Sequence, residues 1–205
     1  MTRHRPALIG AVTAALIGLL VVSAVPAAAV SSRDRYAIGD SVMLGARSAL
    51  KATGFGVDAA VSRQAYSAPR LVRMKGSALP QNVVVHLGTN GTFPLSTCKS
   101  LVKAAGPERR VFLVTVHVRR SWAKSNNAMM RRCDAAFADR RVHVIDWDQA
   151  ASKHRSWLYS DGIHLRPTGA AAFTRLLDAS VDEAVSRDRV QAISEAGGAG
   201  RASVS

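Results

Sequence analysis

Cysteine is scarce in this sequence, and its scarcity excludes several kinds of site. The chain of 205 residues contains two cysteines, Cys98 and Cys133, with no C-x-x-C pair and no zinc-ligand spacing. We therefore expect no metal and no cofactor. Each cysteine lies on the apolar face of an expected helix, which suits either two buried free thiols or one disulfide. Export from the cell would favour the disulfide, because thiols oxidise outside it.

Long apolar runs are absent beyond the N-terminus. The single long run, at residues 7–25, follows two arginines and precedes small residues at 27–29. This is the layout of a secretory signal peptide that is cleaved near Ala29. We therefore expect residues 1–29 to be the signal, the protein to be secreted or associated with the cell wall, and no membrane span to remain after cleavage. An uncleaved, signal-anchored form is the alternative, because the run is long enough to cross a bilayer.

Acidic and aromatic residues are also few. The chain has 14 Asp and Glu residues and 28 Lys and Arg residues, which gives a formal charge of +14, and aromatic residues make up 5% of the chain. No basic run is interleaved with aromatics, which argues against nucleic acid as a partner. A basic exported protein suits an anionic cell-wall polymer, an acidic glycan or a membrane surface, although solubility alone would also explain the charge.

Beyond residue 30, apolar runs typical of strands alternate with helical patterns. The strand-like runs begin near residues 35, 56, 82, 109 and 141, and the expected helices cover residues 42–52, 94–105, 126–138 and 168–185. Continuous apolar strands, each followed by a helix, predict a parallel sheet that is covered on both faces.

This pattern predicts the α/β class: a three-layer α/β/α sandwich with a five-stranded parallel sheet, in the flavodoxin-like strand order 2-1-3-4-5. The domain would cover residues 30–187, and residues 188–205 would form a polar, disordered tail. In this arrangement the helices that carry Cys98 and Cys133 are neighbours on one face, which supports the disulfide.

Polar residues follow the expected strand ends, where open parallel sheets place their sites. Ser41 follows the first strand, Ser62 the second and Asn90 the third, and Asp161 precedes His164 by three residues in a later loop. These are the residue types that enzymatic acyl transfer uses. His164 would remove the serine proton, and Asp161 would hold the imidazole. The backbone N–H groups of Ser41 and Ser62 and the Asn90 amide would stabilise the oxyanion.

Each of these residues also has an ordinary structural interpretation. A serine before a helix is often a cap, and an asparagine in a turn often serves the turn itself. Asp40 is best interpreted as the anchor of the first turn, and His86 as a core histidine. Trp157 and Tyr159 either border an acyl pocket or simply pack. The combination in this order nevertheless favours a site.

The stretches "GDSV", "GTNG" and "DGIHL", which begin at residues 39, 88 and 161, resemble the first, third and fifth sequence blocks of the SGNH (GDSL-type) hydrolases. The resemblance implies a triad of Ser41, Asp161 and His164, with Asn90 as the asparagine of the third block. The glycine of the second block, whose N–H joins the oxyanion hole, is replaced here by Ser62.

Within that family, "SRQ" and "VTVHVRRSW" look most like the extracellular domains of bacterial peptidoglycan O-acetyltransferases. The matching positions, which the resemblance implies as substrate-binding, are Arg63, Gln64, Arg119 and Trp122, and Asn126 follows them. The integral membrane domain that supplies acetyl groups in those proteins has no counterpart in this sequence, which favours hydrolysis.

The sequence therefore predicts an exported serine esterase that cleaves small acyl esters, with an O-acetylated carbohydrate of the cell wall as the preferred substrate. Acyl transfer to a sugar hydroxyl is the first alternative, because it uses the same acyl-enzyme. A wall-binding module without catalytic activity is the second.

Overall fold

Five strands form one parallel sheet. The computed structural model describes residues 34–137 and 141–202, with side chains to residue 195; the expected signal peptide and residues 203–205 lie outside this part. The strands pair in the order β2-β1-β3-β4-β5, and all four pairings are parallel. The strands are β1 (Arg35–Gly39), β2 (Gly56–Ala59), β3 (Asn82–His86), β4 (Arg110–Val114) and β5 (Val142–Ile145). The predicted strand order is confirmed.

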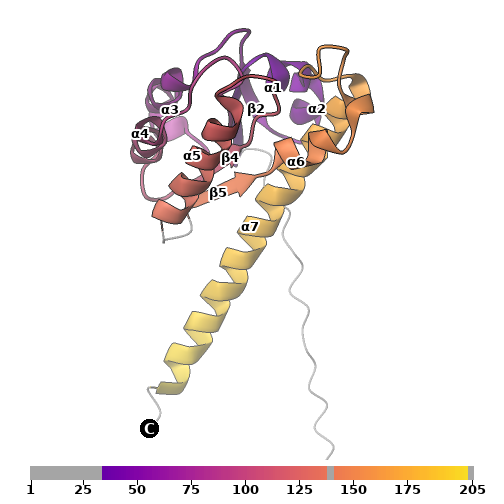
Figure 1. The fold of residues 1–205 in the computed structure, drawn as a ribbon. Helices are drawn as coiled ribbons and strands as arrows, with labels where there is room; N and C mark the ends of the chain where they lie inside the picture. Colours follow the sequence, from indigo (N-terminus) through magenta and orange to yellow (C-terminus); the bar gives the residue numbers. More distant parts are fainter. Residues whose placement is uncertain (1–33, 138–140, 203–205) are drawn as a thin grey trace, which may run out of the picture.

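Helices cover both faces of this sheet, as predicted for a three-layer sandwich (Figure 1). Successive side chains of a strand point to opposite faces, so Ile38 packs with one layer and Ala37 with the other. The first layer contains α3 (Ala68–Lys75), α4 (Leu95–Ala105) and α5 (Ala123–Ala136). The second contains α1 (Ser41–Gly45), α2 (Arg47–Ala52), α6 (Trp147–Ser152) and α7 (Pro167–Ala202).

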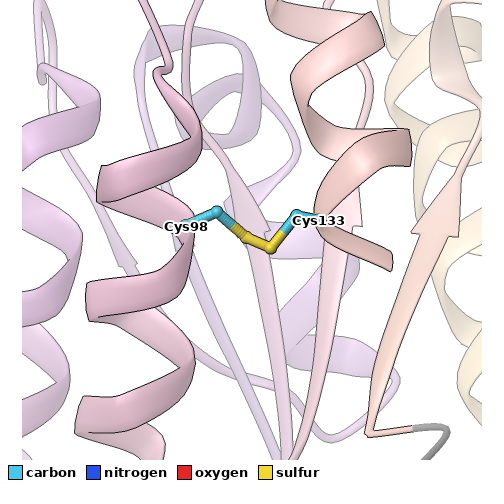
Figure 2. Close-up of a disulfide and its surroundings, with 2 residues drawn as sticks. All are labelled: Cys98 and Cys133. Atoms are coloured by element: carbon cyan, nitrogen blue, oxygen red, sulfur yellow. A yellow bond between two sulfur atoms is a disulfide. The ribbon is translucent and has the colours of Figure 1, made fainter. Parts of the chain in front are cut away.

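A disulfide joins two helices of the first layer. Cys98 of α4 and Cys133 of α5 are bonded, with their Cα atoms 6.4 Å apart and both side chains fully buried (Figure 2). The bond confirms the predicted pairing. It closes a loop with a sequence separation of 35 residues, which in the chain-entropy model stabilises the fold by about 4 kcal/mol.

The last helix is longer than the sequence pattern predicted. The apolar spacing ends near Val185, but α7 continues to Ala202 and projects beyond the sheet (Figure 1). Residues 188–202, for which the sequence pattern leads us to expect a disordered tail, form the last part of this helix in the structure. The stretch 186–195 contains no proline or glycine to stop a helix that has already formed.

Two further helices were missed because they are short. α3 has eight residues and α6 has six, too few for a clear apolar period. Short 3₁₀ turns complete the connections, at Ala65–Ser67, Gly76–Ala78 and Arg155–Trp157. In the part of the chain that the structure describes, no helix combines the length and the apolar character that a membrane crossing requires.

Candidate active site

Ser41 lies where the first strand ends and a short helix begins. Asp40 is the N-cap of α1: its Oδ1 accepts a hydrogen bond from the Val42 N–H at 3.0 Å. A Cβ at Gly39 would overlap with the Met43 side chain, so the approach to this turn requires glycine. Because Asp40 provides the cap, the Ser41 hydroxyl is not needed for that purpose.

Ser41, His164 and Asp161 form a continuous chain of hydrogen-bonding groups. His164 Nε2 lies 3.0 Å from Ser41 Oγ, and His164 Nδ1 lies 2.7 Å from Asp161 Oδ2. The other carboxylate oxygen, Asp161 Oδ1, accepts hydrogen bonds from the backbone N–H groups of Ile163 and His164 at 2.9 and 3.0 Å. This arrangement can move a proton from a serine hydroxyl to an imidazole that a carboxylate orients.

The Asp161 carboxylate favours its charged form. Burial, the largest single influence, raises the pKa of Asp161, but the hydrogen bond with His164, the two backbone N–H donors and the charge of His164 together lower that pKa below its ordinary value of 3.8. The side chains of Asp161 and His164 are 44% and 46% exposed, so water also reaches both groups.

Main-chain contacts close the loop that carries this pair. Leu158 and Leu165 form an antiparallel bridge, and the Tyr159 N–H donates to the His164 carbonyl at 2.9 Å. Gly162 adopts a φ of +70°, a conformation that glycine allows at little cost. These contacts hold the imidazole against the start of α1, far away in sequence.

The Asn90 amide is a donor without an acceptor. Its Nδ2 atom is buried, and no group in residues 34–137 or 141–202 accepts a hydrogen bond from it. Asn90 lines the same cavity, of about 380 Å³, as Ser41, Ser62 and His164. A buried donor is costly unless something accepts its hydrogen bond. The amide is therefore suited to an oxygen of a molecule that enters this cavity.

Two residues at the start of α5 hold the turn that carries Asn90. The buried Asn126 donates from Nδ2 to the carbonyls of Gly88 and Gly91 at 2.9 and 2.8 Å, and its Oδ1 accepts the Phe93 N–H at 2.7 Å. Trp122 Nε1 donates to the Gly88 carbonyl at 3.2 Å. Asn126 thus positions the turn through its backbone.

Ser62 has an unusual backbone conformation. Its φ of +56° lies in the left-handed region, and no other residue of the described chain except glycine has a positive φ. A side chain in this region costs energy, whereas glycine has no Cβ to clash. Ser62 occupies the place where the resembling family has glycine, and its backbone adopts a conformation that glycine allows at the lowest cost.

The four residues that the resemblance assigned to substrate binding occupy different places. Gln64 and Trp122 line the cavity at Ser41, whereas Arg119 lines a larger neighbouring cavity. Arg63 points back to β2, where its Nη1 and Nη2 donate to the Asp58 carbonyl at 2.5 Å and the Asp58 Oδ1 at 2.7 Å.

The two aromatic residues before the Asp-His loop also differ. Tyr159 borders a cavity of about 490 Å³ that Ser41 and His164 also line. Trp157 instead stacks on Trp147, with ring centroids 5.9 Å apart. Trp157 therefore packs, and Tyr159 lies beside the serine.

A second His-Asp pair, which the sequence pattern does not reveal, lies at the neighbouring cavity. His117 Nδ1 lies 2.7 Å from Asp148 Oδ1, and Asn127 Nδ2 donates to Asp148 Oδ2 at 3.2 Å. Asp148 lies in the first turn of α6, three residues after the end of β5, so its closeness to a strand end was the signal that could have found it. Among the described residues, no group of three or more His, Cys, Asp or Glu is arranged to hold a metal ion.

His86 and Asp40 form a buried pair beneath the site. His86 Nδ1 lies 3.3 Å from Asp40 Oδ1, and the two side chains are 1% and 0% exposed. Burial, the largest influence, raises the pKa of Asp40, but the neighbouring His86 ring, Thr89 and the hydrogen bond that the Val42 N–H donates lower it below its ordinary value. The pair thus anchors the first turn to the end of β3.

Comparison with solved structures shows which fold family the protein shares. The fold matches the C-terminal catalytic domain of peptidoglycan O-acetyltransferase A from Streptococcus pneumoniae, with a TM-score of 0.61 and 23% identity over 76% of this chain and 93% of that one. It also matches a GDSL-like lipase from Bacteroides thetaiotaomicron, with a TM-score of 0.58 and 16% identity over 75% of this chain and 89% of that one. The fold is therefore that of the SGNH (GDSL-type) hydrolases.

Sequence relatives then identify the particular branch. The chain is 33% identical to YrhL of Bacillus subtilis (strain 168) over 151 residues, or 72% of this chain and 23% of that protein. It is 33% identical to O-acetyltransferase OatA of Staphylococcus aureus (strain NCTC 8325 / PS 47) over 145 residues, or 68% of this chain and 24% of that protein. The chain is a homologue of the peptidoglycan O-acetyltransferases, with the SGNH fold.

The homology covers one part of these relatives. This chain spans about a quarter of the length of the curated proteins that it matches. A scan of family models gives no match.

Proposed function

We propose that the protein cleaves small acyl esters, above all O-acetyl esters on a cell-wall glycan, through an acyl-enzyme on Ser41. The observation that carries the proposal is the hydrogen-bonded series Ser41–His164–Asp161 beside a buried amide donor without an acceptor. The relatives support the substrate, because OatA of Listeria monocytogenes is named a peptidoglycan O-acetyltransferase.

In the first half of the proposed reaction, Ser41 Oγ attacks the ester carbonyl carbon while His164 Nε2 takes the hydroxyl proton. The resulting imidazolium is stabilised by Asp161. Negative charge moves to the carbonyl oxygen, where the backbone N–H groups of Ser41 and Ser62 and the Asn90 amide donate hydrogen bonds. His164 then returns the proton to the departing sugar oxygen, and the acyl group remains on Ser41.

In the second half, an acceptor hydroxyl loses its proton to His164 and attacks the acyl carbon; the bond from Ser41 Oγ to that carbon then breaks, and His164 returns the proton to Ser41. Water as the acceptor completes hydrolysis, and a sugar hydroxyl completes transfer. Transfer is the second candidate function, because the curated relatives are named O-acetyltransferases. Product analysis with and without an acceptor glycan separates the two.

Export is part of the same proposal. Residues 1–29, outside the described residues, have the layout of a signal peptide, and the disulfide between Cys98 and Cys133 is of the kind that persists outside the cell. Secretion to the wall would place the cavity at Ser41 beside its substrate.

The test is a panel of chromogenic esters of increasing chain length. Wild type should prefer acetyl, and Ser41→Ala should lose at least about 10³-fold in kcat, because no other nucleophile replaces the hydroxyl. Ser96→Ala, an exposed serine of α4, is the matched control and should behave as wild type. Hydrolysis by wild type that is no faster than by Ser41→Ala would contradict the proposal, and hydrolysis by neither above background would leave a binding module.

A further inference from the structure

A large cavity adjoins the one at Ser41. Its volume is about 770 Å³, and its walls come from the segment after β4, from α5, from α6 and from the loop that carries Asp161 and His164. Val118 and Arg120 line both cavities, so the two are continuous neighbours. We call the larger one the basic cavity, because its charged lining is mostly cationic: Arg119, Arg120, Lys124, Arg131, Arg155 and a single acid, Asp148.

Most of these cations have no carboxylate partner. Arg131 Nη2 is paired with Asp146 Oδ2 at 2.7 Å. Within residues 34–137 and 141–202, the other cations, Arg119, Arg120, Lys124 and Arg155, form no ion pair with a carboxylate.

The acid of the cavity does not neutralise them. Asp148 uses one oxygen for His117 Nδ1, at 2.7 Å, and the other for Asn127 Nδ2, at 3.2 Å. These contacts also fix the His117 ring at the cavity wall, where its second nitrogen can meet a polar group of a ligand.

Unpaired cations around one hollow repel one another, and a concave wall concentrates their field. An anion in the cavity would relieve that repulsion. Cations scattered over a flat surface would serve solubility equally well, but these surround a cavity that joins the serine site and includes Gly162 of the Asp-His loop. A molecule with an ester at Ser41 and an acid group nearby on the same chain would fill both cavities.

We propose that the basic cavity binds a carboxylate or phosphodiester group of the same glycan chain that presents its ester to Ser41. This inference rests on the proposed function and adds to it that the substrate is a polyanion. Arg119, Arg120, Lys124 and Arg155 contact the anionic group, and His117 contacts a neighbouring sugar hydroxyl.

Binding is measured by calorimetry on the full chain carrying Ser41→Ala, in low salt, with three probes: tetragalacturonate for carboxylates, a glycerol-phosphate tetramer for phosphodiesters and chitotetraose as the neutral glycan. The cavity variant is Lys124→Gln with Arg155→Gln. The matched control is Lys99→Gln with Lys103→Gln, which removes the same charge from exposed positions on α4.

At least one anionic tetramer binds more tightly than chitotetraose, and the cavity variant weakens that binding roughly tenfold, whereas the control variant does not. The anionic tetramer that shows this loss identifies the acid group. Equal binding of all three probes, or equal losses in the cavity and control variants, overturns the proposal.

A kinetic comparison in the Ser41-containing enzyme completes the test. We compare kcat/KM for an anionic substrate, either an O-acetylated oligogalacturonate or an O-acetylated glycerol-phosphate oligomer, with kcat/KM for O-acetylated chitotetraose. The ratio of the anionic to the neutral value falls about tenfold in the cavity variant, mainly through a higher KM for the anionic substrate. An unchanged ratio for both anionic substrates overturns the inference. If wild type cleaves none of the esters, the proposed function fails, and calorimetry still decides whether the cavity binds anions.

Discussion

At the scale of single residues, Ser62 adopts a left-handed backbone conformation that favours glycine. Its φ of +56° brings the segment after β2 to the cavity at Ser41, although the residue carries a side chain. The cost of this conformation for a residue other than glycine is about 1–2 kcal/mol. Glycine would avoid it but would lose more conformational freedom on folding, so the two effects partly cancel.

We predict that Ser62→Gly unfolds at the same denaturant concentration as wild type or a higher one, whereas Ser62→Val is less stable by roughly 1–3 kcal/mol. A β-branched side chain fits the left-handed region worst, which is the reason for the difference. Urea unfolding of the two variants is the measurement. A Ser62→Val protein as stable as wild type would show that the backbone there is not under strain.

Asp161 keeps its charge at a lower pH than an ordinary aspartate does. Its pKa lies below the ordinary value, so its contribution to stability is complete above the pKa of the unfolded chain and is lost as the pH falls through the lower folded pKa. The carboxylate therefore stays ionised to a lower pH than an ordinary aspartate would, and it continues to orient the His164 imidazole there.

We expect Asp161→Asn to lower kcat for an acetyl ester by about 10²–10⁴-fold. The amide no longer orients the imidazole or stabilises its charged form. Asp134→Asn, an exposed aspartate of α5, serves as control. An Asp161→Asn enzyme with the activity of wild type would remove the carboxylate from the mechanism.

At the scale of elements, one buried arginine fastens α7 to the edge of the core. Arg35 of β1 forms ion pairs with Asp178 and Asp182 of α7. Its side chain is only 6% exposed, whereas those of the two acids are 32% and 51% exposed. Loss of the arginine leaves carboxylates that water can reach, but loss of both acids leaves a buried guanidinium without a partner.

This asymmetry predicts that Asp178→Asn with Asp182→Asn lowers the free energy of unfolding by about 3–5 kcal/mol, and Arg35→Met by only about 1–2 kcal/mol. Denaturant unfolding at neutral pH measures the free energy of unfolding of each variant and shows which is the less stable. If Arg35→Met proved the more damaging change, the arginine would act through packing of its side chain rather than through its charge.

At the scale of the whole molecule, the sequence predicted the sheet because most of its strands are continuous apolar runs with a helical pattern after them. β3 and β4 are examples, with buried Val83, Val84, Val111 and Phe112 on both faces. Such strands have no solvated side and fit only between two helical layers. The disulfide was predicted for the same reason, because the strand order puts α4 beside α5.

The end of α7 and the basic cavity could not be predicted in this way. The helical spacing of apolar residues stops near Val185 because α7 leaves the core there, although the helix itself continues. His117 and Asp148 lie 31 positions apart, and their pairing depends on the positions of two neighbouring strand ends. For the same reason, sequence alone could name Ser41, Asp161 and His164 but not the distances between them.

The most direct test of the central claim, that His164 activates Ser41 as the nucleophile, is covalent labelling with a small sulfonyl fluoride followed by mass spectrometry of the intact protein and its peptides. The account predicts one adduct, on the peptide that contains Ser41, and labelling at least about 10²-fold slower in His164→Ala. An adduct on another residue, or hydrolysis of acetyl esters by a protein that carries the adduct on Ser41, would contradict it.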